Sequence, residues 1–340
     1  MYIGLVGGGG ITDTHARAAL GIPGVQLAAV FGLREARVRR LSAEYGGVPY
    51  TDFDAFLAHR PLDLVVLGSP SGLHACQGIA AAQQGLHVRV EKPLDITLAR
   101  ADALIEAAAA SGVTLGVCLQ DRFKPGVVRL KELIDAGALG RLLTLEGRMP
   151  WYRPPSYYAD SHWRGTSALD GGGALMNQGI HTADLLLWMG GPVRAVQARA
   201  AALLHRIDVE DTAMAILEFE SGALGTLIAT TAAFPGWPRR IVVTGTEGTA
   251  ILEGDSLVDC VLRSGERVVD GQPGPPPPTQ AAASPLVSDV GPHRAVLEDF
   301  IAAVRDRRLP RCDGREGRTS VALVLAIYDA SRTGARVAPG

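Results

Sequence analysis

Short apolar runs alternate with amphipathic stretches over the first third of this chain. The apolar runs have the length of buried strands, and they stand at residues 2–6, 25–31, 62–68, 86–90 and 113–118. Helical patterns separate them, at residues 11–20, 53–59, 74–84 and 98–111. This alternation predicts a parallel, doubly wound sheet with helices on both faces, occupying a first domain over residues 1–120.

The pattern changes after a helix expected at residues 126–136. Strand-like runs follow one another with turns between them, at residues 142–148, 195–204, 212–218, 223–231, 240–244 and 250–253. Consecutive strands of this kind predict a large, mainly antiparallel open sheet. We therefore expect an α/β protein whose second domain, residues 121–340, is α+β. Closing helices are expected at 293–307 and 318–333, and they are the elements that would pack back on the first domain.

A glycine-rich turn joins the first strand to the first helix. Gly7, Gly9 and Gly10 precede Ile11, and Thr12 stands at the third position of a Gly-x-Gly-x-x-Gly/Ala pattern. A strand, a glycine turn and a helix in this order are typical of a dinucleotide-binding Rossmann fold, in which backbone N–H groups hold the pyrophosphate. A plain turn explains the glycines equally well at this point, and Thr12 predicts slightly less close packing of helix on strand.

The second strand ends without the acidic residue that usually binds the adenosine ribose. Gly32, Leu33 and Arg34 stand there instead. Without a carboxylate there is no repulsion toward a 2′-phosphate, and Arg34 is placed to pair with one. The sequence thus favours NADP, with NAD as the alternative. Arg39 and Arg40 are interpreted as part of a solvated helical face.

Two further loops follow strand ends that face the same crevice. Ser69 and Pro70 begin one, and His74 then opens a helix, either contacting the cofactor or bonding to nearby backbone. In the other, Glu91 and Lys92 follow the fourth strand and precede a proline. This pair is either an ordinary surface pair or a crevice pair in which burial tunes the lysine for acid–base work.

A polar series interrupts an otherwise apolar helix in the second domain. Asn177, His181 and Asp184 recur at i, i+4 and i+7, so an α-helix would place them on one face. Capping groups and a satisfied histidine would also explain them. No metal is expected, because asparagine is a poor ligand and no second histidine or cysteine stands nearby.

The composition of the chain limits the partners and the cellular compartment that we expect. The net charge is −2, so no nucleic-acid partner is expected. The four cysteines are scattered and predict reduced thiols. No signal peptide or apolar run of membrane-spanning length is found, which favours the cytoplasm. Residues 271–278 read as a proline-rich surface loop.

Together these features resemble the glucose–fructose oxidoreductase/inositol dehydrogenase/MocA family, over nearly the whole chain. The resemblance is carried by the glycine turn, the loop SPSGLH, Glu91-Lys92-Pro93, Arg122-Phe123, the run WRGT, a triple glycine, and the run NQGIHTAD.

The resemblance implies a nicotinamide-linked oxidoreductase acting on a sugar or polyol. It makes Lys92 and His181 the catalytic pair, with the uncharged Asn177 standing where many members have aspartate. Glu91 and Arg122 join the expected cofactor contacts. Asp184 is expected to orient His181, to stabilise local structure or to meet the substrate. An aromatic and basic group precedes the catalytic helix and is expected to contact the sugar, namely Tyr158, Trp163 and Arg164.

Three alternatives stay open at this point. The enzyme releases its cofactor at each turnover, or it keeps a tightly bound cofactor for exchange between two sugars, or it is an NADP-binding regulator without activity. A homodimer or homotetramer is expected through the open sheet, whose second face would pack against another subunit.

Overall fold

The computed structural model describes residues 1–269 and 289–340. The proline-rich segment expected at 271–278 lies outside the described residues. The chain divides into two compact units. Of the described residues, the first unit contains 1–120 and 289–318. The second unit contains 121–269 and 319–340.

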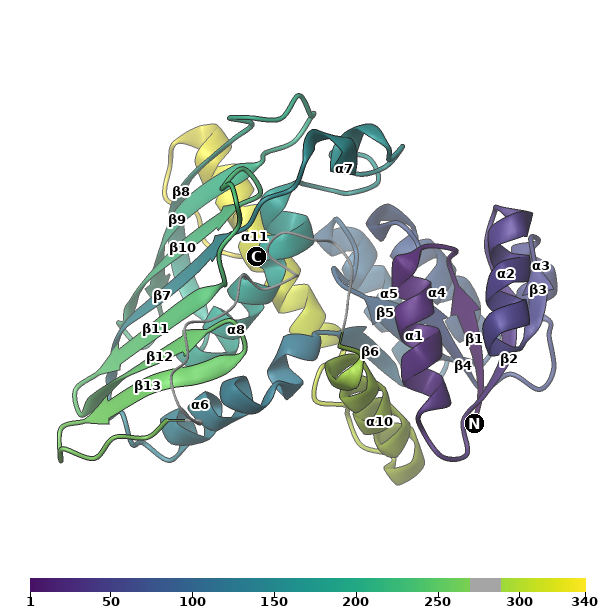
Figure 1. The fold of residues 1–340 in the computed structure, drawn as a ribbon, viewed down its shortest axis with the longest axis horizontal. Helices are drawn as coiled ribbons and strands as arrows, with labels where there is room; N and C mark the ends of the chain where they lie inside the picture. The colour runs from purple at the N-terminus through teal and green to yellow at the C-terminus, as the bar shows by residue number, and fades with distance from the viewer. Residues whose placement is uncertain (270–288) are drawn as a thin grey trace. The chain divides into compact units, whose positions relative to one another are not determined.

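The first unit is built on a six-stranded parallel sheet, which confirms the predicted doubly wound fold (Figure 1). Its strand order is β3-β2-β1-β4-β5-β6, so the order reverses between β1 and β4, where ligands bind in such sheets. Its strands are β1 (Tyr2–Val6), β2 (Gln26–Phe31), β3 (Val48–Tyr50), β4 (Leu64–Leu67), β5 (His87–Glu91) and β6 (Leu115–Cys118). The short β3 was not expected from the sequence, because three residues are too few for a periodic signal.

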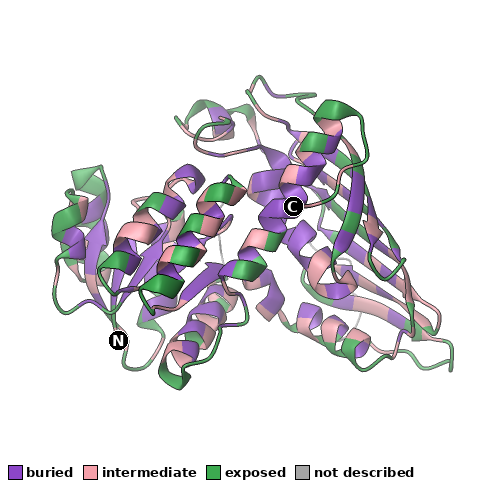
Figure 2. Ribbon diagram, turned by 180° about the vertical axis from the view of Figure 1, so that it is seen from behind, coloured by how far each residue is buried: buried purple, intermediate pink, exposed green. Residues whose placement is uncertain are grey.

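Helices cover the first sheet and complete its core. They are α1 (Gly10–Leu20), α2 (Glu35–Tyr45), α3 (Phe53–Leu57), α4 (His74–Gln83), α5 (Leu98–Ala110) and α10 (Gly291–Asp306). Figure 2 shows the strands of this sheet buried and the exposed residues on the outer sides of its helices. Leu297 and Phe300 of α10 join the same hydrophobic cluster as Ile3 and Leu5 of β1. The first unit therefore uses a helix that lies far beyond residue 120.

The second unit contains a seven-stranded sheet in the order β13-β12-β11-β7-β10-β9-β8. The pair β7–β10 is parallel and the other neighbours are antiparallel, which confirms a mainly antiparallel sheet. The strands are β7 (Leu142–Pro150), β8 (Val193–Ala201), β9 (Thr212–Phe219), β10 (Leu224–Thr230), β11 (Arg240–Gly245), β12 (Gly248–Glu253) and β13 (Ser256–Leu262).

Two of these strands differ from the expectation. The strand expected to reach residue 204 ends at Ala201, because the Asp211 carboxylate accepts hydrogen bonds from the backbone N–H groups of Leu203, Leu204 and His205 and turns the chain away from the ladder. The edge strand β13 was not expected, since its buried positions do not alternate regularly.

Helices lie against one face of the second sheet. The helices of this unit are α6 (Pro125–Asp135), α7 (Pro155–Ala159), α8 (Ile180–Gly190) and α11 (Gly314–Thr333), whose first residues belong to the other unit, and a π-helical segment η3 (Ala174–Gly179) runs into α8. In Figure 1, α6 and α8 lie on the same side of the sheet. The approach of α8 depends on Gly147 of β7, where a Cβ atom would lie 2.8 Å from the methyl carbon of Thr182.

The opposite face of this sheet is exposed. In β9, Ala213, Ala215 and Leu217 are buried, whereas Met214 and Ile216, which alternate with them, are each 53% exposed. Among the described residues, no helix has the length and hydropathy needed to cross a membrane.

Candidate active site

The glycine turn leaves space in front of the N-terminus of α1. Gly7 has φ +129°, and a Cβ atom there would lie 2.7 Å from both the carbonyl oxygen of Gly68 and Oγ1 of Thr12. Among the described residues, a Cβ atom at Gly9 or Gly10 would meet no atom within 4 Å. Gly9 caps α1 without a side-chain hydrogen bond. The first-turn N–H groups of α1 therefore face room for a phosphate group.

Thr12 packs more closely than the fingerprint predicts. It is 1% exposed, and it fits because Gly7 and Gly68 opposite it both lack a side chain. Ile11 lies beside Gly68 as well, with its Cγ2 atom 3.2 Å from where a Cβ atom would stand. The closeness that a small third residue usually provides comes here from glycines on the strand side.

The end of β2 presents arginines and no acid. Gly32 is buried, and a Cβ atom there would lie 3.1 Å from the carbonyl oxygen of Gly7. Arg34 is the exposed N-cap of α2. Arg39 and Arg40 are paired with Glu35 at 2.7 Å and with Asp13 at 2.8 Å, which confirms that they belong to a solvated, ion-paired face.

His74 contacts two loops, which follow the carboxyl ends of β4 and β5. Its Nδ1 lies 2.8 Å from the carbonyl oxygen of Pro93 and its Nε2 lies 3.0 Å from that of Ser69. The imidazole is 1% exposed. The structure shows the backbone contacts that were one of the two interpretations left open by the sequence. Ser69 also bonds to Gln77 (2.6 Å), and Pro70 begins the 3₁₀ turn that leads to His74.

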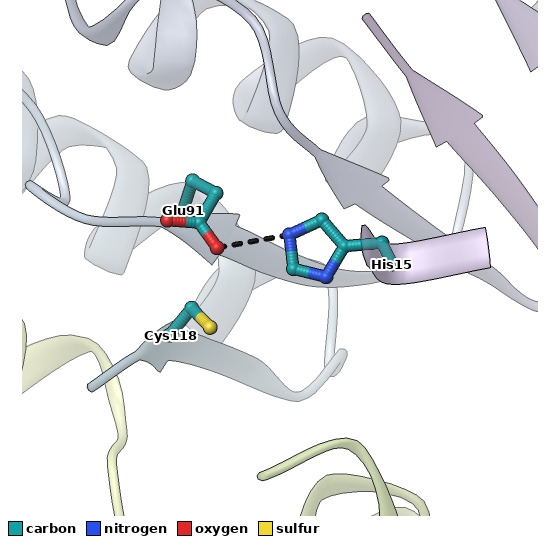
Figure 3. A group of neighbouring side chains, drawn as sticks. All are labelled: His15, Glu91 and Cys118. Carbon is teal, nitrogen blue, oxygen red and sulfur yellow. Dashed lines mark ion pairs between the residues drawn. The ribbon is translucent and has the colours of Figure 1, made fainter. Parts of the chain in front are cut away.

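The Glu91 side chain belongs to a buried network in the first unit (Figure 3). Its Oε1 lies 2.9 Å from Nε2 of His15, and its Oε2 accepts a 3.2 Å hydrogen bond from the backbone N–H of Lys92. Arg89 lies 3.3 Å from Nδ1 of His15 and donates to the Cys118 thiol at 3.0 Å. These contacts give Glu91 a structural role beside Lys92, at a position where a cofactor contact was expected.

The charges of these side chains explain how the network is stabilised in the protein interior. Burial lowers the pKa of His15, which favours the neutral imidazole, and in that form Nδ1 can accept from the Arg89 guanidinium. Burial alone would raise the pKa of Glu91, but its bond to His15 and the nearby cationic groups hold it well below its usual value. His15, Glu91 and Cys118 bring three metal-ligand atoms within 4.8 Å of one another. The Arg89 guanidinium supplies there the positive charge that a metal ion would bring.

A buried ion pair fixes the start of the second unit to α8. Arg122 donates to the two carboxylate oxygens of Asp184 at 2.9 and 2.6 Å, and the Ser320 hydroxyl donates to the same carboxylate at 2.8 Å. The side chains of Arg122 and Asp184 are 2% and 1% exposed. Of the roles expected for Asp184, this ion pair favours the stabilisation of local structure, and it engages the Arg122 side chain, for which a cofactor contact was expected.

His181 lies in the first turn of α8 and interacts electrostatically with a second buried acid, Asp121. Burial would raise the pKa of Asp121, but the charges of Arg239, Lys124 and His181 hold it well below its usual value. The sequence contains no local signal for this pair, since the two residues are 60 positions apart.

The three polar residues of the helix do not share one face. Asn177 lies in the π-helical η3, whose wider turn breaks the 3.6-residue period assumed from the sequence. Its Nδ2 donates to Asp170 at 2.7 Å, whereas Asp184 bonds to Arg122. A carboxylate thus adjoins the amide of Asn177, and it comes from a residue that the sequence did not single out.

The triple glycine allows η3 to approach β9 and α11. A Cβ atom on Gly173 would lie 1.7 Å from the carbonyl oxygen of Glu210, and one on Gly172 would lie 2.2 Å from the Tyr328 hydroxyl oxygen. The Glu210 carboxylate accepts from the N–H groups of Gly173 (2.9 Å) and Leu175 (2.8 Å). These contacts hold the segment that leads to His181.

The aromatic and basic residues before η3 divide into two groups. Tyr158 is 7% exposed, and its hydroxyl is bonded to Thr231 at 2.8 Å, so it is a packing residue and not the expected sugar contact. Trp163 and Arg164 stack on each other, with the guanidinium 4.9 Å from the ring centre. Arg164 also lies 4.6 Å from the ring centre of Tyr157.

Comparison with known proteins identifies the family. The first 119 residues match the oxidoreductase family with an NAD-binding Rossmann fold, and residues 127–251 match the GFO/IDH/MocA C-terminal domain. Myo-inositol 2-dehydrogenase from Thermotoga maritima is 31% identical over 256 residues, covering 73% of this chain and 74% of the relative. The chain belongs to the Gfo/Idh/MocA family of oxidoreductases.

Other members of this family are similar over nearly the full length. The WlbA dehydrogenase from Bordetella pertussis, solved with NADH and UDP-GlcNAcA, has a TM-score of 0.86 and 32% identity, covering 99% of this chain and 98% of that one. D-xylose 1-dehydrogenase (NADP(+)) 2 from Haloferax volcanii is 28% identical, covering 99% of each chain.

Proposed function

We propose that this family member is an NAD(P)-dependent oxidoreductase that transfers a hydride between nicotinamide and a carbon of a sugar, sugar derivative or polyol. The observation that carries the proposal is the open space at Gly9 and Gly10, in front of the uncapped N-terminus of α1, in a chain of this family. The relatives named for inositol, xylose and a UDP-sugar acid support the substrate class.

The cofactor supplies the hydride acceptor or donor, and the chain supplies orientation and proton transfer. Gly7, Gly9, Gly10 and Ile11 form the turn that would hold the pyrophosphate. NADP is the proposed cofactor, because Gly32 leaves the end of β2 without a carboxylate and Arg34 is exposed beside it.

Lys92 and His181 are proposed to act on the reacting oxygen. Lys92 polarises and holds this oxygen, and His181 takes or gives the hydroxyl proton. The Glu91–His15 pair fixes the backbone at Lys92, and the Asp121 carboxylate, which interacts electrostatically with His181, lies near the imidazole. Asn177, anchored to Asp170, positions a substrate hydroxyl.

The test is a panel of neutral and acidic sugars and polyols assayed with NADP and with NAD. We expect hydride transfer with at least one member and a higher kcat/KM for NADP. A clear preference for NAD would refute the proposed role of Arg34. Binding of NADPH without turnover across the panel would favour a regulator, and cofactor retained through purification would favour exchange between two sugars.

We also propose that the exposed face of the second sheet joins two or more copies of the chain. Met214 and Ile216 of β9 and Leu224 of β10 are each more than half exposed. An apolar sheet face of this kind usually packs against another layer. Analytical ultracentrifugation should give the mass of a dimer or tetramer, and a monomer at micromolar concentration would refute the assignment.

A further inference from the structure

Two arginines flank one tyrosine in the second unit, outside the residues assigned above to catalysis. The Arg153 guanidinium lies 5.6 Å from the centre of the Tyr157 ring, and that of Arg164 lies 4.6 Å from it. Each arginine also stacks on a tryptophan, Arg153 on Trp151 at 5.1 Å and Arg164 on Trp163 at 4.9 Å. Aromatic stacking of this kind fixes the plane of a guanidinium while leaving its edge for hydrogen bonds.

The positive charges of Arg153 and Arg164 act unfavourably on each other. Arg164 forms no ion pair with any residue in the described part of the chain, and its buried Nε has no hydrogen-bond partner there. Burial lowers the pKa of Arg153, and the charge of Arg164 contributes in the same direction. The nearby Asp170 uses its two carboxylate oxygens for the N–H of Gly165 and the amide of Asn177. An anion that bound both arginines would therefore relieve a repulsion.

Polar atoms of the adjoining residues also point to a ligand. Gln178 is 6% exposed, and its Nε2 donates to the Tyr157 hydroxyl at 2.9 Å. The Oε1 atom of the same side chain is buried and accepts no hydrogen bond from any described residue. The Nε1 donor of Trp151 is also buried and has no hydrogen-bond partner among the described residues. A buried acceptor and a buried donor without partners cost free energy unless a ligand satisfies them, and sugar hydroxyls provide both kinds of group.

We propose that Arg153 and Arg164, both held against the ring of Tyr157, bind a carboxylate or phosphate group of an acidic sugar substrate. The planar guanidinium fork matches both kinds of oxyanion. Gln178 adjoins this site and lies three residues before His181 in the same helical segment, so it accepts from a hydroxyl of the same sugar. This inference rests on the proposed function, because it names the substrate class of that site.

The experiment is calorimetric titration of the full-length protein saturated with NADPH, which prevents oxidation of a hydroxyl substrate. Glucuronate carries only a carboxylate, UDP-glucose carries only a diphosphate, and glucose carries neither. Wild type is compared with Arg164→Met, with Arg164→Lys, and with Arg39→Met as a matched control on the exposed, ion-paired face of α2.

We expect at least one acidic probe to bind more tightly than glucose. Arg164→Met should weaken that probe by about tenfold to a hundredfold and leave glucose within about twofold. The affinity of Arg164→Lys for that probe should lie between those of the wild type and Arg164→Met, since lysine keeps the charge and loses the planar guanidinium fork. Arg39→Met should have no effect. Whether glucuronate or UDP-glucose gives the effect distinguishes a carboxylate from a phosphate.

Equal affinity for glucose and both acidic probes would overturn the inference, as would an equal loss for all probes in Arg164→Met. Failure of both acidic probes to bind the NADPH-loaded protein would overturn it too. NADPH binding is measured first by fluorescence. Absence of that binding in the wild type would refute the proposed function itself, and is therefore distinguishable from failure of the acidic site.

Discussion

Replacing Asp184 with asparagine tests whether its role is structural. The wild-type carboxylate receives two hydrogen bonds from Arg122 and one from Ser320, and both members of the ion pair are almost fully buried. Asp184→Asn keeps the shape of the side chain but leaves the Arg122 charge buried without its counter-charge. Removing one partner of such a pair costs about 3–5 kcal/mol of unfolding free energy.

The assay is equilibrium unfolding in urea, with NADPH affinity and sugar KM measured on the folded variant. Glu44→Gln is the matched control, because the Arg40–Glu44 pair has side chains 50% and 48% exposed. A solvent-exposed pair contributes about 0–1 kcal/mol. The double variant Arg122→Met with Asp184→Leu should be more stable than either single variant, since it removes both charges together.

The result that would refute this reasoning is equally specific. If Asp184→Asn were no less stable than Glu44→Gln but raised the KM for the sugar, Asp184 would be a substrate contact, as the sequence had suggested. Loss of stability with an unchanged KM would establish the structural role.

Two further predictions concern the first unit. The folded protein keeps His15 neutral, whereas the unfolded chain takes up a proton there below pH about 6.5. The unfolding free energy should therefore fall as pH drops through that value, by up to about 1.4 kcal/mol per pH unit. Urea titrations at several pH values should show a flatter slope for His15→Gln. Parallel slopes for the two proteins would contradict a neutral His15. Gly7→Ala should lower the free energy of unfolding by about 1–3 kcal/mol, because of the positive φ at this position alone. Gly10→Ala should keep the stability of the fold and lose NADPH affinity, because its new methyl group enters the open space. Equal stability of these two variants would count against the turn geometry.

The sequence predicted the elements whose signal is local. The alternation of apolar runs and helices identified five of the six strands of the first sheet, and the glycine turn located the N-terminus of α1. The missing strand, β3, has only three residues. The second sheet was predicted as mainly antiparallel, but the parallel pairing of β7 with β10 depends on contacts across more than 70 residues and has no local signal.

The candidate site was less predictable, because the partner of a buried polar side chain is chosen by tertiary structure. Asp184 and Arg122 are 62 positions apart, and Glu91 and His15 are 76 apart. Spacing along a helix predicted one shared face for Asn177 and Asp184, and the π-helical turn removed it. The triple glycine was recognised as a motif, but its cause, the close approach of Glu210 and Tyr328, is visible only in the fold.

The central claim is that Lys92 polarises and holds the reacting oxygen, while His181 takes or gives its proton, during nicotinamide-linked oxidation or reduction of a sugar. The most direct test is single-turnover absorbance of the nicotinamide with the best substrate of the panel, for wild type, Lys92→Met and His181→Gln. We predict that each variant binds NADPH with wild-type affinity and loses at least about 100-fold in the rate of hydride transfer. Near-normal transfer in either variant, with the cofactor bound, would contradict the account.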